Sequence, residues 1–199
     1  MGLWIEAAKT QARTIMRDLM EEHPTQRFFF AAVFYRDFED ATPFIEIPFQ
    51  DDITFDIQDV RPIGGGDIPE DVAGGYERVL SMDWSNADVK FCFHIADAPP
   101  HGREWHTPDI EDAYPSDVLS RRPLEDTIRD LHDNEIRLTI FRVNESLNIM
   151  IDRFVSIYGN ELHVEELPHD YSPMIGGDVA RMLSRGITRQ ITETLSLID

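Results

Sequence analysis

A glycine-rich segment carries three carboxylates and is the stretch of this sequence best suited to chemistry. Residues 64–75 read GGGDIPEDVAGG, and their acids are Asp67, Glu70 and Asp71. The glycines allow a tight turn, Asp67 could cap the helix expected to follow, and Pro69 suits a first helical turn. The residues alone leave two interpretations open: a well-capped helix, or a turn that binds an ion.

Two further acids follow apolar segments that read as strands. Asp37 comes just after residues 28–35, and Asp97 comes just after residues 89–96. In sheets of parallel strands ligands bind beyond the carboxyl ends, so these acids could converge with the glycine-rich turn. Singly, each acid could instead cap a turn or pair with a neighbouring base. Jointly they predict a site for Mg²⁺ or Mn²⁺, or for Ca²⁺, because carboxylates suit hard cations. The candidate ligands are Asp37, Asp97 and the three acids of the turn, Asp67, Glu70 and Asp71.

Histidines offer other kinds of site. His94 lies inside a predicted strand, where a polar core residue is expected, whereas His101 and His106 flank a turn in the long loop of residues 97–122. We expect this pair at the metal-facing rim, on a loop that faces a partner. A hydrolase could use Asp97, His101 as base, and Ser116 or Ser120 as nucleophile. The sequence has no Gly-x-Ser-x-Gly motif to support that alternative.

Alternating strands and helices must position these residues. Hydrophobic periodicity and turn residues predict the boundaries. Helices are expected at 3–22, 52–60, 71–82, 123–134, 145–158 and 177–197, and strands at 27–35, 44–49, 89–96, 136–143 and 161–167. The first strand reads as buried on both faces, and Pro48 marks the second as an edge strand. The pattern predicts one α/β domain spanning residues 1–199, with a mostly parallel sheet covered on both faces.

Charge and composition exclude several classes of partner. Lys and Arg number 18 against 38 Asp and Glu, which gives a net charge of −20. Such a charge opposes binding to nucleic acid or to an anionic membrane surface. The longest apolar run, residues 28–35, is far shorter than the roughly 20 residues that span a bilayer. The first residues lack the pattern of a signal peptide, and the lone Cys92 cannot form an internal disulfide. We therefore expect a cytoplasmic protein.

Four segments together resemble a von Willebrand factor type A (vWA) domain, of the subgroup found in proteins with alpha-type kinase domains. They are YRDFED at 35–40, GGGDIPEDVAGG at 64–75, HIADAPPHG at 94–102 followed by His106, and YPSD at 114–117. The resemblance implies a doubly wound, Rossmann-like sheet with helices on both faces. It also implies a metal-ion-dependent adhesion site whose coordination a carboxylate of a protein partner completes.

The resemblance assigns roles to the acids already singled out. Glu70 or Asp67 matches the second element of the family's site, and Asp97 matches the third. A more distant likeness to the I-like domain of integrin β subunits makes Asp37, Asp67 and the carbonyl of Pro69 candidates for an adjacent cation site.

The family's first element, Asp-x-Ser/Thr-x-Ser, is absent from this sequence. The resemblance places residues 1–6 just after that motif, and it places the missing strand centrally, between residues 28–35 and 89–96. Two explanations are possible: the chain is a fragment, or it is a divergent domain whose sheet is closed without this strand. We expect a fragment. Cation binding is then expected to be weak, because too few ligands remain for octahedral Mg²⁺.

The function predicted from the sequence is a protein-interaction module without catalysis. The motifs of a protein kinase catalytic domain are absent, so the kinase domain of the family's proteins is expected to be a separate module. The alternatives are a metal-dependent hydrolase or phosphotransfer enzyme, and a degenerate structural domain that binds no metal.

Overall fold

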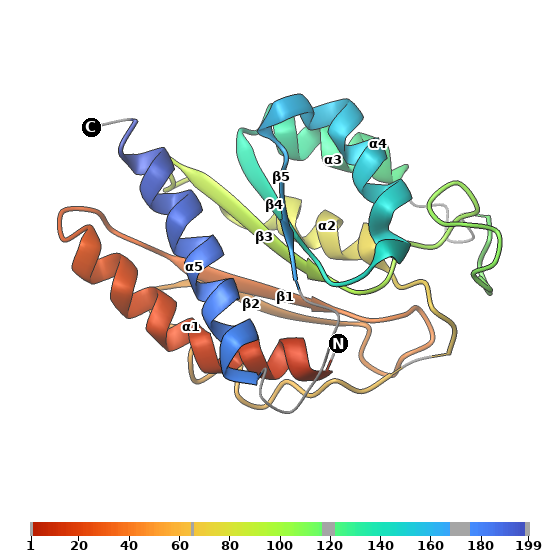
Figure 1. Ribbon diagram of the computed structural model, residues 1–199, viewed down its shortest axis with the longest axis horizontal. Helices are drawn as coiled ribbons and strands as arrows, with labels where there is room; N and C mark the ends of the chain where they lie inside the picture. Colours follow the sequence, from red (N-terminus) through yellow and green to blue (C-terminus); the bar gives the residue numbers. More distant parts are fainter. Residues whose placement is uncertain (1, 65, 117–121, 168–175, 198–199) are drawn as a thin grey trace. The chain divides into compact units, whose positions relative to one another are not determined.

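The computed structural model describes residues 2–64, 66–116, 122–167 and 176–197. Helices and strands alternate along much of the chain, so the protein is α/β (Figure 1). The helices are α1 (Gly2–Glu22), α2 (Val72–Ser81), α3 (Leu124–Asp133), α4 (Asn148–Tyr158) and α5 (Gly176–Leu195), with 3₁₀ turns at Glu145–Leu147 and Gly159–Glu161. The strands are β1 (Phe30–Tyr35), β2 (Phe44–Gln50), β3 (Lys90–Ala96), β4 (Ile136–Arg142) and β5 (His163–Glu166).

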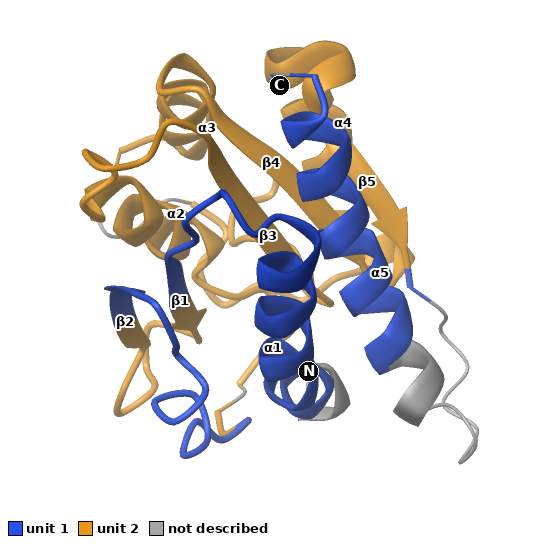
Figure 2. Ribbon diagram, turned by 90° about the vertical axis from the view of Figure 1, so that its left-hand side faces the viewer, with its two compact units in different colours: residues 1–32, 47–62, 167–199 blue, residues 33–46, 63–166 orange. Residues whose placement is uncertain are grey.

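The chain divides into two compact units, which are coloured separately in Figure 2. The first unit takes in residues 1–32, 47–62 and 167–199, and the second takes in residues 33–46 and 63–166. Strands β1 and β2 each begin in one unit and end in the other. The single domain expected from the sequence stays a prediction.

The second unit is built on a parallel three-stranded sheet in the order β3-β4-β5. Lys90 of β3 pairs with Ile136 of β4, and Ala96 pairs with Arg142, so the two strands end at the same level. Helices α2, α3 and α4 flank the sheet and share one core with β4. Its fully buried side chains include Ile128, Leu131, Leu138, Ile140, Met150 and Phe154. A parallel sheet flanked by helices agrees with a Rossmann-like fold, and helices on both faces stay a prediction.

Strand β1 pairs with β2 in a separate two-stranded sheet. All six residues of β1 are half-buried, so the prediction of a strand buried on both faces is wrong. Complete burial requires a strand neighbour on each side, and the described residues give β1 only one. Strand β3 likewise pairs on one edge only within the described chain, with β4.

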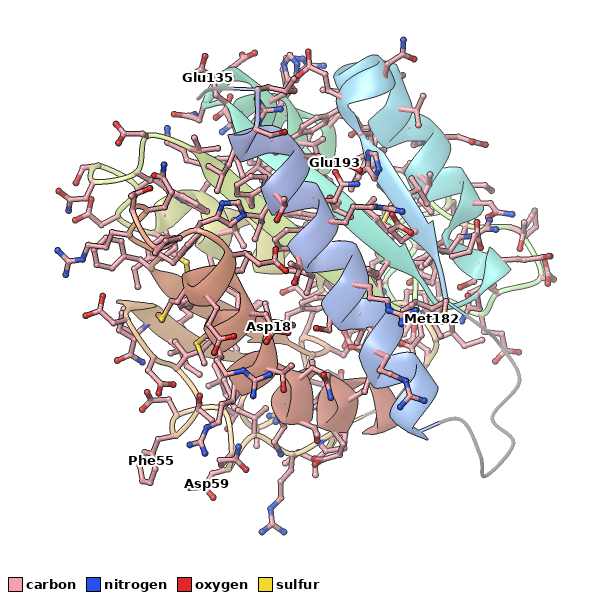
Figure 3. All side chains as sticks on the ribbon, turned by 60° about the vertical axis from the view of Figure 1, so that its left-hand side comes forward. Asp18, Phe55, Asp59, Glu135, Met182 and Glu193 are labelled. Carbon is pink, nitrogen blue, oxygen red and sulfur yellow. The ribbon has the colours of Figure 1, made fainter. Side chains whose placement is uncertain are left out.

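The first unit contains α1 and α5, which pack against each other, and an irregular segment at residues 51–62. The helix predicted at 52–60 is wrong. Main-chain bonds there form separate turns, such as Ile57 N to Ile53 O and Gln58 N to Phe55 O, and the Asp52 carboxylate accepts from Thr54 N. Phe55 is 86% exposed and stands out from this segment (Figure 3). A short helix gains most of its stability from packing, and a turn held by an Asp side chain competes with it.

The other predicted helices and strands are found with small shifts at their ends. The helix expected at 145–158 begins at Asn148, because Glu145–Leu147 forms a 3₁₀ turn that the Asn144 side chain caps at Ser146 N. No helix in the described part of the chain has the length and apolar character needed to cross a bilayer.

Candidate metal centre

The helix that follows the acidic turn is capped by a different residue from the one predicted from the sequence. Helix α2 starts at Val72, and its N-cap is Asp71, whose carboxylate accepts from Gly74 N at 2.8 Å. The predicted cap, Asp67, instead accepts from Ala113 N at 2.6 Å. Glu70 forms an isolated parallel bridge with Pro100, which keeps the chain extended and delays the helix. The Asp67 carboxylate is therefore available to the loop rather than to the helix.

Glycine is required at the start of this turn. Gly64 has a φ of +119°, in the region that favours glycine. A Cβ atom at Gly64 would lie 2.2 Å from Oδ2 of Asp40, which is too close for any side chain. The glycine therefore lets the turn approach the Asp40 carboxylate.

Main-chain hydrogen bonds fasten the turn to the segments that follow β1 and β3. Asp71 N donates to Arg36 O at 3.3 Å, and Glu70 N donates to Pro99 O at 3.0 Å. These bonds bring together three parts of the chain that are distant in sequence. Asp37, just after β1, and the loop after β3 thus come close to the acidic turn.

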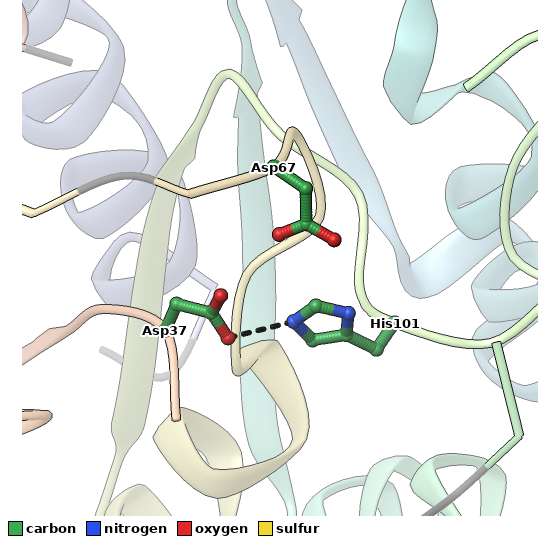
Figure 4. Close-up of side chains that lie close together, drawn as sticks. All are labelled: Asp37, Asp67 and His101. Carbon is green, nitrogen blue, oxygen red and sulfur yellow. Dashed lines mark hydrogen bonds and ion pairs between the residues drawn. The ribbon is translucent and has the colours of Figure 1, made fainter. Parts of the chain in front are cut away.

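Asp37, Asp67 and His101 form the group best placed to hold a metal ion. Each offers one ligand atom, and the three atoms lie within 4.8 Å of one another (Figure 4). His101 Nε2 lies 2.8 Å from Asp37 Oδ1, and Asp37 is only 7% exposed. Oδ1 of Asp67 is buried and has no hydrogen-bond partner within the described chain. The predicted residues Asp37 and Asp67 therefore lie together, with His101 as the third member.

Asp112 holds the histidines of this loop in place. Oδ1 of Asp112 lies 2.7 Å from His101 Nδ1 and also accepts a hydrogen bond from Tyr114 N. Oδ2 lies 3.0 Å from His106 Nε2 and also accepts a hydrogen bond from Gly102 N. Burial opposes the charged form, but the hydrogen bonds from His101, Gly102, His106 and Tyr114 outweigh it, and the pKa of Asp112 falls to about 2. Sequence reasoning missed Asp112. The available signal was an acid in the same loop as two histidines.

Both loop histidines are directed inward. Their side chains are only 6% and 3% exposed, for His101 and His106 respectively. The His101 ring stacks on Phe38 with centroids 4.7 Å apart and meets the edge of Tyr114 at 5.1 Å. The structure thus places both rings against carboxylates inside the unit, and a partner-facing role for the loop stays a prediction.

Glu70 and Asp97 border the group without belonging to it. Oε2 of Glu70 is buried and has no hydrogen-bond partner in the described structure. The pKa of Glu70 is raised to about 7, mainly by burial and further by the charges of Asp37, Asp40 and Asp97. His101 lowers this pKa. Burial and the neighbouring carboxylates together therefore make the charged form of Glu70 less favourable than it is in water.

His94 lies in a different environment, between two tyrosines. Its Nε2 lies 2.7 Å from the Tyr35 hydroxyl, and its Nδ1 lies 2.7 Å from the Tyr76 hydroxyl. Burial lowers the pKa of His94 to about 4, so the ring is neutral near pH 7. The prediction of a polar core residue is confirmed.

The hydrolase alternative gains no support from this geometry. Both ring nitrogens of His101 are engaged, with Asp37 and Asp112. Ser116 is exposed, and Ser120 lies outside the described residues. The interactions of His101 therefore do not form the predicted arrangement with Asp97 and a serine.

Comparisons with known proteins connect part of the chain to a kinase. No protein-family model matches the sequence. The alpha-protein kinase vwkA of Dictyostelium discoideum is 35% identical to this chain over 99 residues. The similar region covers 49% of this chain and 16% of that kinase. The chain is thus similar to a small part of the kinase.

Proposed function

We propose that the second unit is an interaction module of the vWA type that binds a divalent cation and, through it, a protein partner. The observation that carries the proposal is that two buried carboxylate oxygens, Asp67 Oδ1 and Glu70 Oε2, have no hydrogen-bond partner among the residues that the structure describes. A buried polar atom without a partner is costly, and the cost is larger for a charged group. A cation between these acids would satisfy both oxygens.

The local charge supports the same proposal. Asp37, Asp40 and Asp97 all disfavour the charged form of Glu70, whereas His101 favours it. A divalent cation would compensate this repulsion, and oxygen ligands fit Mg²⁺, Mn²⁺ or Ca²⁺. The proposed oxygen ligands are Asp37 and Asp67 of this group, with Glu70 and Asp97 as further acids at its border. The cation would supply a positive centre to which a partner's carboxylate can bind.

The proposed partner is a protein, and no catalytic step is proposed. This rests on the resemblance to vWA domains and on the similarity to part of the alpha-protein kinase vwkA. Kinase activity is named for that protein, and the similarity covers only 16% of it. We propose that the chain corresponds to a non-catalytic module of the kind associated with alpha-type kinases.

Thermal unfolding with added metal tests the cation site. Mg²⁺, Mn²⁺ or Ca²⁺ at ten times its dissociation constant would stabilise the folded state by about 1.4 kcal/mol. That corresponds to a rise in Tm of roughly 3–5 °C for a chain of this size. Asp67→Asn is expected to abolish the rise, whereas Asp133→Asn on α3, where the side chain is 66% exposed, should retain it. An unchanged Tm of the natural chain at millimolar concentrations of all three metals would refute a site for these cations.

Affinity capture tests the interaction. Proteins bound by the immobilised chain are compared with Mg²⁺ or Mn²⁺ present and after EDTA, with Asp67→Asn and Asp133→Asn as a matched pair. We expect a bound protein that EDTA releases and that only the Asp67 variant fails to capture. Metal binding without any metal-dependent capture would favour a structural role for the ion.

A further inference from the structure

A carboxylate faces each ring nitrogen of His101, Asp112 at Nδ1 and Asp37 at Nε2. The Asp112 carboxylate only accepts, and its Oδ1 lies 2.7 Å from Nδ1 of the ring. The main-chain N–H groups of Gly102 and Tyr114 fix the orientation of this carboxylate. A neutral ring that donates from Nδ1 to Asp112 turns the lone pair of Nε2 toward Asp37 Oδ1, 2.8 Å away, and that oxygen also accepts from Phe38 N.

A neutral ring in this tautomer would place two acceptors against each other. Nε2 would present a lone pair to the carboxylate oxygen of Asp37, so a positive species must lie between them. A second proton on His101 would satisfy Asp37. It would still leave Oδ1 of Asp67 buried and without a hydrogen-bond partner among the described residues, on a side chain close to Asp37 and His101 (Figure 4). A metal ion can satisfy all three atoms at once.

We infer that His101 is a ligand of the cation, through Nε2, and that the site therefore prefers a zinc-like transition metal to Mg²⁺ or Ca²⁺. The inference rests on the proposed cation site and specifies its chemistry. Imidazole nitrogen favours Zn²⁺ and Co²⁺, whereas Mg²⁺ and Ca²⁺ favour all-oxygen sites. The three ligands would be His101 Nε2 and one carboxylate oxygen each from Asp37 and Asp67, whose candidate atoms lie within 4.8 Å of one another.

The surrounding residues match the usual support of a metal-bound histidine. Such a histidine donates its other N–H to a carboxylate, which fixes the ring and increases its basicity. Asp112 fills this role for His101, and His106 positions Asp112 from the other side at 3.0 Å. A metal at Zn–N and Zn–O distances of about 2.0–2.1 Å separates its ligand atoms by roughly 3.3 Å. Asp37 and His101 would then move apart slightly, and the proton displaced from Nε2 passes to solvent.

Titration calorimetry with Zn²⁺, Co²⁺ and Mg²⁺ tests the inference. We expect Zn²⁺ to bind at least about 100-fold more tightly than Mg²⁺. Replacing His101→Gln should weaken Zn²⁺ binding by more than about tenfold and change Mg²⁺ binding much less. The matched control is His132→Gln on α3, a half-buried histidine away from the group, and it should bind both metals as the natural chain does.

A measurement on the natural chain keeps the test decisive if His101→Gln fails to fold. Zinc added to protein labelled with ¹⁵N in its histidines should shift the His101 Nε2 resonance and leave the His94 resonances in place. A shift of the His101 resonance alone, with a proton still on Nδ1 of His101, supports the inference.

The outcomes separate this inference from the proposed function. Equal affinities for Zn²⁺ and Mg²⁺, or zinc binding that survives His101→Gln in a folded variant, would overturn the role of His101 and leave an oxygen-ligand site. An absence of binding by every metal tested would overturn both. An unshifted His101 resonance at saturating zinc would also reject nitrogen coordination.

Discussion

The tyrosine-bound His94 and the carboxylate-bound His101 are both buried in the second unit, yet their partners differ in kind. His94 meets the hydroxyls of Tyr35 and Tyr76. His101 meets the carboxylates of Asp37 and Asp112. A hydroxyl can donate or accept, so a neutral ring satisfies the first arrangement. A carboxylate only accepts, so the second arrangement needs positive charge.

This difference shows that the partners of a buried histidine, and not its burial, indicate its role. Burial without a charged partner lowers the pKa of His94 to about 4 and keeps it a neutral core group. The His101 environment contains Asp37, Asp112 and the nearby Asp67, so it offers carboxylate oxygens to a metal ion. Three changes test how far the two environments differ.

The largest effect is expected from Asp112→Ala, which removes the carboxylate shared by His101 and His106. Breaking a buried, hydrogen-bonded charge network typically costs about 3–5 kcal/mol of unfolding free energy. Denaturant unfolding at pH 7 measures the loss. Asp109→Ala, at an exposed position of the same loop, should change stability by no more than about 0.5 kcal/mol. A loss below about 1 kcal/mol for the Asp112 variant would mean that the network does little to stabilise the loop.

An intermediate effect is expected from His94→Leu. The substitution leaves the Tyr35 and Tyr76 hydroxyls buried without their imidazole partner, at a cost of about 1–3 kcal/mol. Adding Tyr76→Phe should recover part of the loss, because it removes one of the two unsatisfied groups. Denaturant unfolding of the single and double variants measures this, and a double variant no more stable than His94→Leu alone would contradict it.

The same variant has a characteristic pH dependence. The pKa of His94 is about 4 in the folded chain and 6.5 when unfolded, so the unfolded state binds more protons between these values. His94 therefore lowers stability as the pH falls from about 6.5 to about 4. The free-energy difference between the natural chain and His94→Leu should shrink over that range, and a constant difference would refute the neutral state of the ring.

The smallest effect is expected from Glu70→Gln in buffer without metal. The pKa of Glu70 is raised from 4.5 to about 7 in the folded chain. Between these pH values the folded state binds more protons than the unfolded state does. The stability of the natural chain therefore falls as the pH rises from about 4.5 to about 7. Glutamine removes this dependence. The variant should match the natural chain near pH 5 and exceed its Tm at pH 8 by no more than roughly 3 °C, since solvent screens a partly exposed charge. A lower Tm at pH 8 would contradict the proposed repulsion.

The sequence predicted the elements of the second unit better than it predicted the details of the site. Strands β3 and β4 and helices α2 and α3 lie within one or two residues of their predicted ranges, because long periodic segments show their structure locally. The cap at Asp71 was missed because the bridge between Glu70 and Pro100 is a contact between distant segments. The turns at 52–60 were missed because a local Asp52 bond replaces the first turn of a short helix.

The sequence by itself determined the α/β class, the strong negative charge and the presence of acids at the ends of strands. Only the tertiary structure decided that His101 lies between Asp112 and Asp37, and that Asp67 comes close to them. It also decided that one buried oxygen of Asp67 has no hydrogen-bond partner within the described chain. Periodicity records which residues are apolar, which is a local property. The partners of a polar side chain depend on segments brought together by folding, and those partners set its charge and its ligands.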